Sequence, residues 1–551
     1  MGEQSLETVD PVARLRDAVR EVAAELGGDG TGGSPTLERP PRAELGDYST
    51  NAAMLLAPVL GAPPREIAER LSEPLASRLG ADVDRIEIAG PGFLNLFLAD
   101  RWCRDGVREV LVAGAEFGAG AAVGDRIAVE FVSANPTGPL TAAGGRHAAF
   151  GDSVARVLER AGHRVERHYY LNDTGGQVLR FAASIAARMT GGEPPEDGYE
   201  GAYVGELAQE LAAGGAPGDL DALGRLGTEA MRERIGATLE RFGVTFDRWY
   251  SERSYQESGK MGAAIAKLRE AGHVYESEGA TWLRTGEFGD DKDRVLLRSD
   301  GEPTYFAADI AYHLEKTEQF DHLINVLGVD HHGYVARMRA ALGAAGADPD
   351  RFEAPLINLV HIVEAGERAQ MSKRKGEFVT LDELVEDIGV DAARWFMVQR
   401  SNDTQIDLDL DLARKQSSDN PVYYVQYAHA RIASILRKAE AETDWETSPE
   451  RIARAAEAGL GTTAEPAERA LVKRLLAEPS EVRAAAELRA PHRLCAYATE
   501  TAADFHAFYR DCQVVGAGGE LEQARLALCV ATKSVIASTL GLLGVSAPER
   551  M

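Results

Sequence analysis

The sequence predicts a parallel α/β sheet of the Rossmann type, with a helical insertion, a small N-terminal α+β domain and a C-terminal all-α bundle. Residues 126–132 read as a buried strand, and a loop, a helix over 146–161 and a strand over 165–171 follow it. This order is one βαβ unit of a parallel sheet. From Asp391 onward apolar residues recur almost throughout at helical spacing. The first 98 residues mix helices with two short strands.

The N-terminal elements follow from hydrophobic periodicity. Apolar residues at helical spacing predict helices over 11–26, 52–60 and 64–79. Residues 83–88 and 93–98 read as strands joined by the turn Gly90-Pro91-Gly92. We therefore expect a domain over residues 1–118, which ends at a Gly/Ala-rich linker.

The central part, residues 119–406, combines sheet and helix. Residues 175–275 are mostly helical, with Gly/Pro-rich breaks, and predict an insertion over about 178–280. We then expect a hairpin over 281–305 with its turn at 300–303, an apolar strand over 322–327 and a βα segment over 355–363. The remaining residues, 407–551, are predicted to form the helical bundle.

Composition excludes several classes of protein. The chain has 551 residues and a formal net charge of −27, which argues against non-specific coating of nucleic acid. None of its four cysteines forms a C-x-x-C pair, so we expect no structural metal site and a reducing, cytoplasmic location. The first 30 residues lack the apolar segment of a signal peptide, and we expect no membrane span.

Two loops carry most of the chemical information. Residues 133–140, S-A-N-P-T-G-P-L, follow the first sheet strand and open a helix, where free backbone N–H groups can bind phosphate. Residues 370–376, Q-M-S-K-R-K-G, place three cations in a short loop, which suits a polyphosphate. A Pro/Gly turn without ligand and a solvated basic loop are the simpler interpretations.

Six segments in this order resemble the class I aminoacyl-tRNA synthetases, and among them the bacterial arginyl-tRNA synthetases. The resemblance covers nearly the whole chain. Its segments are 46–51, G-D-Y-S-T-N; 129–140, V-E-F-V-S-A-N-P-T-G-P-L; 168–177, H-Y-Y-L-N-D-T-G-G-Q; 328–334, G-V-D-H-H-G-Y; 371–373, M-S-K; and 417–431, S-S-D-N-P-V-Y-Y-V-Q-Y-A-H-A-R.

The resemblance implies an arginine–tRNA ligase that uses ATP with Mg²⁺, L-arginine and tRNA(Arg). It also implies a monomer, which is the usual state in the family. The N-terminal domain would contact the tRNA elbow, and the bundle would bind the anticodon. Implied ATP-binding residues are Pro136, Gly138, Gly145, Asp330, His331, Met371 and Ser372. Implied arginine-binding residues are Asn135, Asn172, Tyr305 and Asp309, and implied tRNA-binding residues are Tyr427, Arg431 and Tyr509.

The arginine site has a physical rationale. A guanidinium presents five N–H donors in a fixed fork and favours a bidentate carboxylate. Tyr305 and Asp309 lie four residues apart and share one face of a helix. The alternatives are a buried strand-end aromatic for Tyr305 and an ordinary N-cap for Asp309. Metal binding by His331 and His332 is disfavoured, because adjacent strand residues point to opposite sides.

One family signature is missing. The H-I-G-H or H-V-G-H segment is replaced by Thr141-Ala142-Ala143-Gly144, so both of its histidines are absent. Loss of one such positioned donor costs about two to three orders of magnitude in rate. His147 lies one helical turn further on and could reach toward phosphate. The implied catalytic residues are thus Thr141, Gly144 and His147, together with Lys373 and Arg374 in a K-M-S-K-S-like loop that begins with Gln370.

The missing histidines leave two hypotheses. The chain is either an arginine–tRNA ligase compensated by other groups, or a paralogue that binds arginine or tRNA as a regulator or in a specialised pathway. Under both, restoring histidine at positions 141 and 144 is expected to raise the rate at least roughly tenfold.

The C-terminal bundle mixes aromatics with cations near its start, as unpaired bases require. The residues concerned are Tyr423, Tyr424, Tyr427, His429 and Arg431. The alternative places Tyr423 and Tyr427, four residues apart, in the bundle core. Because the chain is acidic overall, we expect tRNA affinity to depend on a few cationic loops and to fall steeply with salt.

Overall fold

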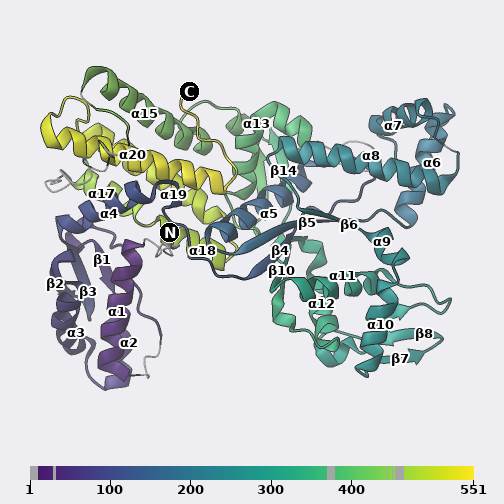
Figure 1. Ribbon diagram of the computed structural model, residues 1–551, viewed down its shortest axis with the longest axis horizontal. Coiled ribbons are helices and arrows are strands. Elements are labelled where there is room, and N and C mark those ends of the chain that lie inside the picture. The colour runs from purple at the N-terminus through teal and green to yellow at the C-terminus, as the bar shows by residue number, and fades with distance from the viewer. Residues whose placement is uncertain are drawn as a thin grey trace, which may run out of the picture.

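A computed structural model describes residues 10–28, 33–216, 218–368, 379–443, 445–448, 451–452, 454 and 465–551. Three parts follow one another along the chain (Figure 1). In the first, helices pack on an antiparallel sheet of order β1-β3-β2; the sequence predicted the strands β2 and β3 and missed the short β1. The elements are α1 (Pro11–Gly27), β1 (Tyr48–Thr50), α2 (Ala52–Leu60), α3 (Pro64–Leu79), β2 (Val83–Ala89), β3 (Phe93–Leu98) and α4 (Asp100–Ala113).

A five-stranded, all-parallel sheet lies at the centre of the molecule (Figure 1). Its order is β12 (Phe352–Glu353), β10 (His322–Asn325), β4 (Arg126–Glu130), β5 (Arg164–Leu171) and β6 (Arg248–Ser251). The crossover α5 (Ala142–Arg160) joins β4 to β5, which confirms the predicted βαβ unit. Ile127, Ala128 and Val129 are fully buried, as a sheet covered on both faces requires.

The structure corrects three boundaries in this region. β4 ends two residues early, because Val132 and Ser133 adopt left-handed backbone angles, with φ of 68° and 37°. α5 begins four residues early, because Thr141 caps its N-terminus. β6 lies within the stretch that the sequence predicted to be helical and forms the edge of the central sheet. With four residues it is too short for its alternation to be recognised.

The insertion has its own apolar core, built on side chains such as Phe181, Ile185 and Leu207. The expected hairpin is instead a three-stranded antiparallel sheet, and the turn at 300–303 follows its last strand. The elements are α6 (Gly176–Met189), α7 (Ala202–Ala213), α8 (Leu220–Arg241), α9 (Glu252–Glu257), α10 (Lys260–Glu270), β7 (Val274–Ser277), β8 (Ala280–Leu283) and β9 (Arg294–Leu297).

The remaining central elements surround the carboxyl edge of the sheet. They are α11 (Tyr305–Gln319), β11 (Leu327–Gly328), α12 (His332–Ala344), β13 (Leu356–Ile357), β14 (Val360–Glu364), β15 (Glu367–Arg368), α13 (Leu381–Val398), β16 (Ile406–Asp409) and α14 (Leu410–Ala413). β16 was not predicted; it pairs in parallel with β14.

The C-terminal part is the predicted helical bundle (Figure 1). Its helices are α15 (Pro421–Glu442), α17 (Pro466–Leu475), α18 (Glu478–Glu487), α19 (His492–Asp511) and α20 (Gly519–Leu542). Contrary to our expectation of no such segment, α20 is long and apolar enough to cross a membrane by length and composition. Of its most apolar stretch 61% is buried, however, because α15, α17 and α19 pack against it.

A buried ionic contact joins the first part to the bundle. Asp47 precedes β1, and its carboxylate accepts from Arg469 Nε at 2.9 Å and Nη2 at 2.6 Å, and from Lys473 Nζ at 2.9 Å. The backbone N–H of Leu98 donates to the same carboxylate at 2.8 Å. Burial acts to raise the pKa of Asp47, but Arg469 and Lys473 outweigh it and hold the pKa at about 2.

We predict that Asp47→Asn lowers the free energy of unfolding at pH 7 by about 3–5 kcal/mol, because it leaves the Lys473 ammonium without its carboxylate and Arg469 with the exposed Asp100 alone. The lowered pKa means that the carboxylate stabilises the fold above its unfolded pKa of about 4, and that this stabilisation is lost as the pH falls toward 2. Urea unfolding at pH 7 and pH 3 tests both statements.

Glu21→Gln is the matched control, because Glu21 binds Arg78 in an exposed ion pair. It should leave the unfolding midpoint almost unchanged. An Asp47→Asn variant as stable as wild type at pH 7 would contradict the role given to this contact.

Candidate active site and tRNA-binding face

The loop after β4 is held in place by the neighbouring strand. Ser133 Oγ accepts from the Tyr170 N–H at 3.1 Å and donates to Glu130 at 3.3 Å. The Tyr169 hydroxyl accepts from the Ala134 N–H and donates to the Ala134 carbonyl. These bonds fix the left-handed turn at Val132 and Ser133, a conformation that costs energy in a β-branched residue and occurs mainly at functional sites.

Two of the expected arginine-binding residues lie in contact. Asn172 Nδ2 donates to Asn135 Oδ1 at 3.1 Å, and Asn135 Nδ2 donates to Gln177 Oε1 at 2.6 Å. These amides come from three segments: the loop after β4, the end of β5 and the start of α6. Gln177 is a site residue that sequence reasoning did not single out, although it belongs to the 168–177 motif.

The other two, Tyr305 and Asp309, lie on the first turns of α11 as predicted. Both simpler interpretations are wrong. Tyr305 is 59% exposed, with its hydroxyl against Gly175, and the N-cap of α11 is Thr304, which accepts from the Ala307 N–H.

Asp309 belongs to a group of acidic side chains that we call the carboxylate cluster: Glu130, Asp173, Glu252 and Asp309. Burial raises the pKa of Asp309 to about 7, and the charges of Glu252 and Glu130 add to the shift. Burial and Asp173 likewise raise the pKa of Glu252 to about 7. Burial and the repulsion between these carboxylates dominate the two shifts, although the charge of Arg337 and a hydrogen bond with Tyr334 act to lower the pKa of Asp309.

Within the described part of the chain, Glu130 is the member of the carboxylate cluster that a buried lysine neutralises. It accepts from Tyr312 Oη at 2.5 Å and from the buried Lys316 Nζ at 3.1 Å. Burial acts to raise the pKa of Glu130, but Lys316 outweighs it, so the pKa lies below its usual range. Glu252 and Asp309 form no ion pair among the described residues, which leaves their carboxylates able to bind a cationic ligand. Glu252 was missed because nothing in its local sequence marks it.

At the start of α5, the residues that stand in place of the missing histidine signature have clear structural roles. Thr141 Oγ1 accepts from the Gly144 N–H at 3.3 Å and so caps the helix, while its own proton stays available to a ligand. A Cβ at Gly144 would lie 2.5 Å from Leu140 Cδ1. Histidine at position 144 therefore requires the buried Leu140 to move, which corrects the expectation that both histidines can simply be restored.

Two further residues need correction. A Cβ at Gly145 would lie 2.7 Å from Leu381 and 3.0 Å from Met397, so this glycine lets α5 approach α13 and does not face a nucleotide. Burial lowers the pKa of His147 to about 4. Its imidazole is neutral at pH 7 and cannot replace the lost histidines as a positive charge near phosphate.

Asp330 and His331 lie in the 3₁₀ turn that follows β11, and His332 begins α12. The histidines are thus in helical turns and not in a strand, as our argument against a metal had assumed. Met371, Ser372, Lys373 and Arg374 lie outside the described residues. The backbone that follows them is tied to the α5 loop, because Ala142 N donates to Val379 O and Leu381 N donates to Leu140 O.

The expected tRNA-binding residues lie together on α15 and α19. The Arg431 guanidinium lies 4.6 Å from the Tyr427 ring centroid and 5.4 Å from that of Tyr509. Tyr423 stacks on Tyr427, and His506, missed in the sequence, contacts Tyr427. These five residues form what we call the aromatic face.

The aromatic face lies outside the bundle core. Tyr423 and Tyr427 are half-buried, which contradicts the alternative that placed them in the core. His429, by contrast, is buried, with Nδ1 against the Pro548 carbonyl. It is therefore not available to bases, contrary to the sequence interpretation.

A parallel sheet, a helix that starts at its carboxyl edge and an appended helical bundle form the architecture of a class I aminoacyl-tRNA synthetase. Three family models match: the arginyl tRNA synthetase N terminal domain over residues 13–98, the class I (R) tRNA synthetase catalytic domain over 221–433, and the DALR anticodon binding domain over 425–551.

Comparisons over the whole chain indicate the same family as these domain matches. The arginine–tRNA ligase of Frankia alni is 48% identical and that of Carboxydothermus hydrogenoformans 44% identical, each covering 94% of this chain and 94% of the relative. The crystal structure of Thermus thermophilus arginyl-tRNA synthetase superposes with a TM-score of 0.79 at 27% identity, over 98% of this chain and 100% of that one. This chain belongs to the arginyl-tRNA synthetase family.

The carboxylate cluster predicts a pH-dependent affinity for arginine. Because the guanidinium binds ionised carboxylates, protons compete with it below the raised pKa of about 7. We expect the Kd for arginine to be about tenfold weaker at pH 6 than at pH 8 for each group that must ionise. Calorimetric titrations in two buffers should also detect proton release.

The variant Asp309→Asn shows how much of the pH dependence of arginine binding comes from Asp309 and how much from Glu252. It should weaken arginine binding and remove the part of the pH dependence that Asp309 contributes. It should also stabilise the free protein at pH 8, because the negative charge at position 309, which Glu252 and Glu130 repel, is gone. A Kd that is the same at pH 6 and pH 8 would mean that the cluster does not bind the guanidinium.

Proposed function

We propose that this protein is an arginine–tRNA ligase whose guanidinium site is the carboxylate cluster. In the first step the arginine carboxylate attacks the α-phosphorus of ATP, a P–O bond breaks and pyrophosphate leaves. In the second step a hydroxyl at the tRNA 3′ end attacks the arginyl carbonyl, and AMP leaves. The observation that carries the proposal is the group of acidic side chains at this site, in which burial and neighbouring carboxylates raise the pKa values of Asp309 and Glu252 to about 7.

Arginine would bind across the carboxyl edge of the sheet. Asp309 and Glu252 would hold the guanidinium, with the Tyr305 hydroxyl beside it. Asn135 and Asn172, fixed by Gln177, would meet the α-amino and carboxylate groups. A neutral side chain of the same length would leave two buried charges unpaired, and this supports selectivity for arginine.

ATP would enter as its Mg²⁺ complex, and we assign no protein ligand to the metal. Pro136 and Gly138 line the loop that leads into α5, whose N-terminus attracts phosphate. The Thr141 proton and the cations Lys373 and Arg374 would meet the charge that develops as pyrophosphate leaves. Asp330 and His331 would lie along the nucleotide, and Met371 and Ser372 would flank it.

The tRNA would lie along the other two parts of the chain. Its anticodon bases would stack on the aromatic face, where Arg431 adds a cation. Its elbow would contact the N-terminal domain, residues 1–118. We place the catalytic domain at 119–406 and the anticodon-binding domain at 407–551. The proposal includes a cytoplasmic monomer.

The second hypothesis, a paralogue without useful aminoacylation, is not supported. The relatives that match over 94% of this chain are arginine–tRNA ligases. The carboxylate cluster and the helix cap are intact as well, so only the absent histidines speak for it.

The central test is arginine-dependent exchange of pyrophosphate into ATP in the presence of tRNA. We expect exchange in the wild type and at least a tenfold lower rate in Thr141→Val, which removes the donor at the helix start. Thr141→Val should also lower the free energy of unfolding by about 1 kcal/mol through loss of the cap. Thr141→Ser keeps the hydroxyl and should retain most of the rate.

Retained arginine binding without exchange in the wild type would contradict the proposed ligase. Equal rates for Thr141→Val and the wild type would contradict only the role of the threonine.

The aromatic face is tested by tRNA affinity at several salt concentrations. We expect Arg431→Gln to weaken binding and to reduce the slope of log K against log salt by up to about one. Arg339→Gln, on α12 outside the proposed tRNA surface, is the control and should change neither. A wild-type affinity that does not depend on salt would mean that tRNA is not the partner.

A further inference from the structure

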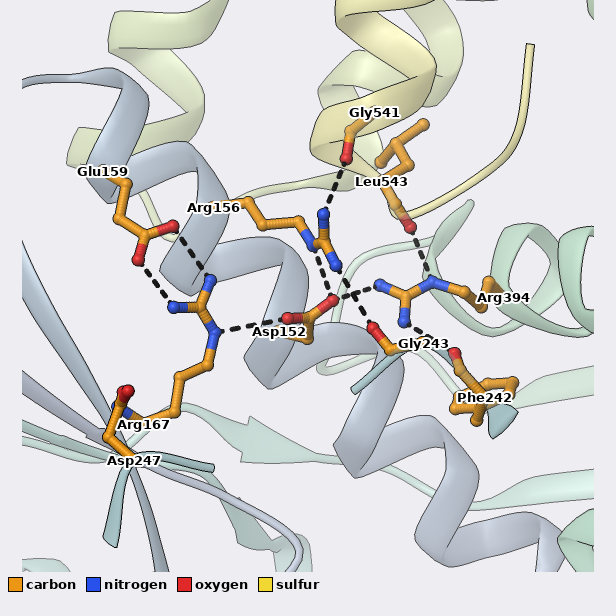
Figure 2. A network of polar contacts seen from close by, with 10 residues as sticks. All are labelled: Asp152, Arg156, Glu159, Arg167, Phe242, Gly243, Asp247, Arg394, Gly541 and Leu543. Atoms are coloured by element: carbon orange, nitrogen blue, oxygen red, sulfur yellow. Dashed lines mark hydrogen bonds and ion pairs between the residues drawn. The ribbon is translucent and has the colours of Figure 1, made fainter. Parts of the chain in front are cut away.

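A buried carboxylate in the middle of α5 holds together segments from all over the molecule. Asp152 is 1% exposed, and it accepts from Arg394 Nη2 at 2.6 Å, Arg156 Nε at 2.7 Å and Arg167 Nε at 3.3 Å (Figure 2). The three guanidiniums come from α13, α5 and β5. Their charge holds the pKa of Asp152 below its usual range despite burial, so Asp152 is ionised at neutral pH.

The arginines use their other N–H groups on helix ends. Arg394 Nε donates to the Leu543 carbonyl at 2.9 Å, and Nη1 donates to the Phe242 carbonyl at 3.1 Å. Arg156 donates to the Gly541 and Gly243 carbonyls at 3.4 Å and 3.1 Å. These carbonyls stand at the C-terminal ends of α20 and α8, which lack intrahelical donors and favour cations.

The same two helices, α5 and α13, frame the proposed ATP loop at their other ends. Thr141 caps α5, and it forms an isolated β-bridge with Thr380, the N-cap of α13. The Leu140 carbonyl accepts from the Leu381 N–H at 2.8 Å. α13 is kinked at Gly389, so its first turns are fixed against α5 by backbone bonds at the ATP loop and its second half by the contact of Asp152 with Arg394.

The contacts of Arg394 and Arg156 with the end of α20 connect Asp152 to the helices that carry the aromatic face. Leu543 and Gly541 close α20, and α20 packs along α15, which carries Tyr427 and Arg431. A continuous set of packed helices thus runs from the aromatic face through α20 to Asp152, and from there along α5 to Thr141. Gly544, with φ of +67°, leaves its backbone against the Arg394 guanidinium, where a Cβ has no room.

We propose that Asp152 and Arg394 are positioning residues. They make the position of α5 relative to α13 depend on the position of the helical bundle, and in this way they align the ATP loop for adenylate formation. This inference rests on the proposed ligase function. It assigns the pair an effect on the rate of the chemical step and none on the binding of either arginine or tRNA, because neither side chain touches those ligands.

The test uses full-length Asp152→Asn and Arg394→Lys. Asparagine keeps the shape but loses the charge, and lysine keeps the charge but cannot reach all three acceptors. We expect Asp152→Asn to lower kcat for pyrophosphate exchange at least tenfold, with the KM for arginine and the Kd for tRNA within threefold of wild type. Arg394→Lys should give a smaller loss of kcat.

Glu468→Gln is the matched control. Glu468 is fully buried and binds Arg525 Nε at 2.5 Å, but this pair joins α17 to α20 inside the bundle. Its loss should lower the thermal midpoint as Asp152→Asn does and leave kcat within twofold. If kcat of Asp152→Asn stays within twofold of wild type, or if Glu468→Gln loses as much, the inference is overturned.

A second variant covers the case in which Asp152→Asn does not fold. Gly544→Ala pushes on the Arg394 guanidinium without removing a charge and should lower kcat at unchanged tRNA affinity. Gly346→Ala is its control, because Gly346 has φ of +77° with open space for a Cβ. Equal kcat in these two variants overturns the inference while leaving the ligase in place. A wild type without exchange overturns the ligase and this inference together.

Discussion

Buried carboxylates bound to arginine and lysine hold the three parts of this molecule in one arrangement. Asp47 fixes the N-terminal part to α17, and Asp152 joins α5 and α13 to the end of α20. Each carboxylate is removed from water, so it requires its partners in place, and each partner comes from a distant part of the sequence. The positions of the other helices follow from these contacts and from the apolar core around them.

The same chemistry, left incomplete, makes the binding site. Glu130 has its cation in Lys316, whereas Asp309 and Glu252 form no ion pair among the described residues, and burial together with neighbouring carboxylates raises their pKa values. In the proposed complex the guanidinium of arginine would complete this site. The same kind of interaction would then serve the fold, within the chain, and the binding of substrate.

The altered signature at residues 141–144 is consistent with its surroundings. Threonine caps α5, and glycine at 144 gives Leu140 room to pack. The start of the helix is therefore formed without either histidine, and the free backbone N–H groups of its first turn do not depend on them. The missing imidazoles would be additional hydrogen-bond donors to the ATP phosphates. Without them, we expect Thr141 and residues 369–378 to supply the groups that meet the developing negative charge.

Sequence alone determined the class of each part and the identity of the family, because periodicity is a local property and the motifs are short. The resemblance to the family also assigned Asn135, Asn172, Tyr305 and Asp309 to one arginine site, and the structure brings Asn135 into contact with Asn172. Only the tertiary structure decided which groups are paired. Glu252 lies close enough to Asp309 to raise its pKa, although the two residues are distant in the sequence. His147 is half-buried and His429 is buried, and β6 pairs with β5 although a long stretch of chain separates them. Burial and ion pairing depend on neighbours that the local sequence does not contain, so these assignments required the fold.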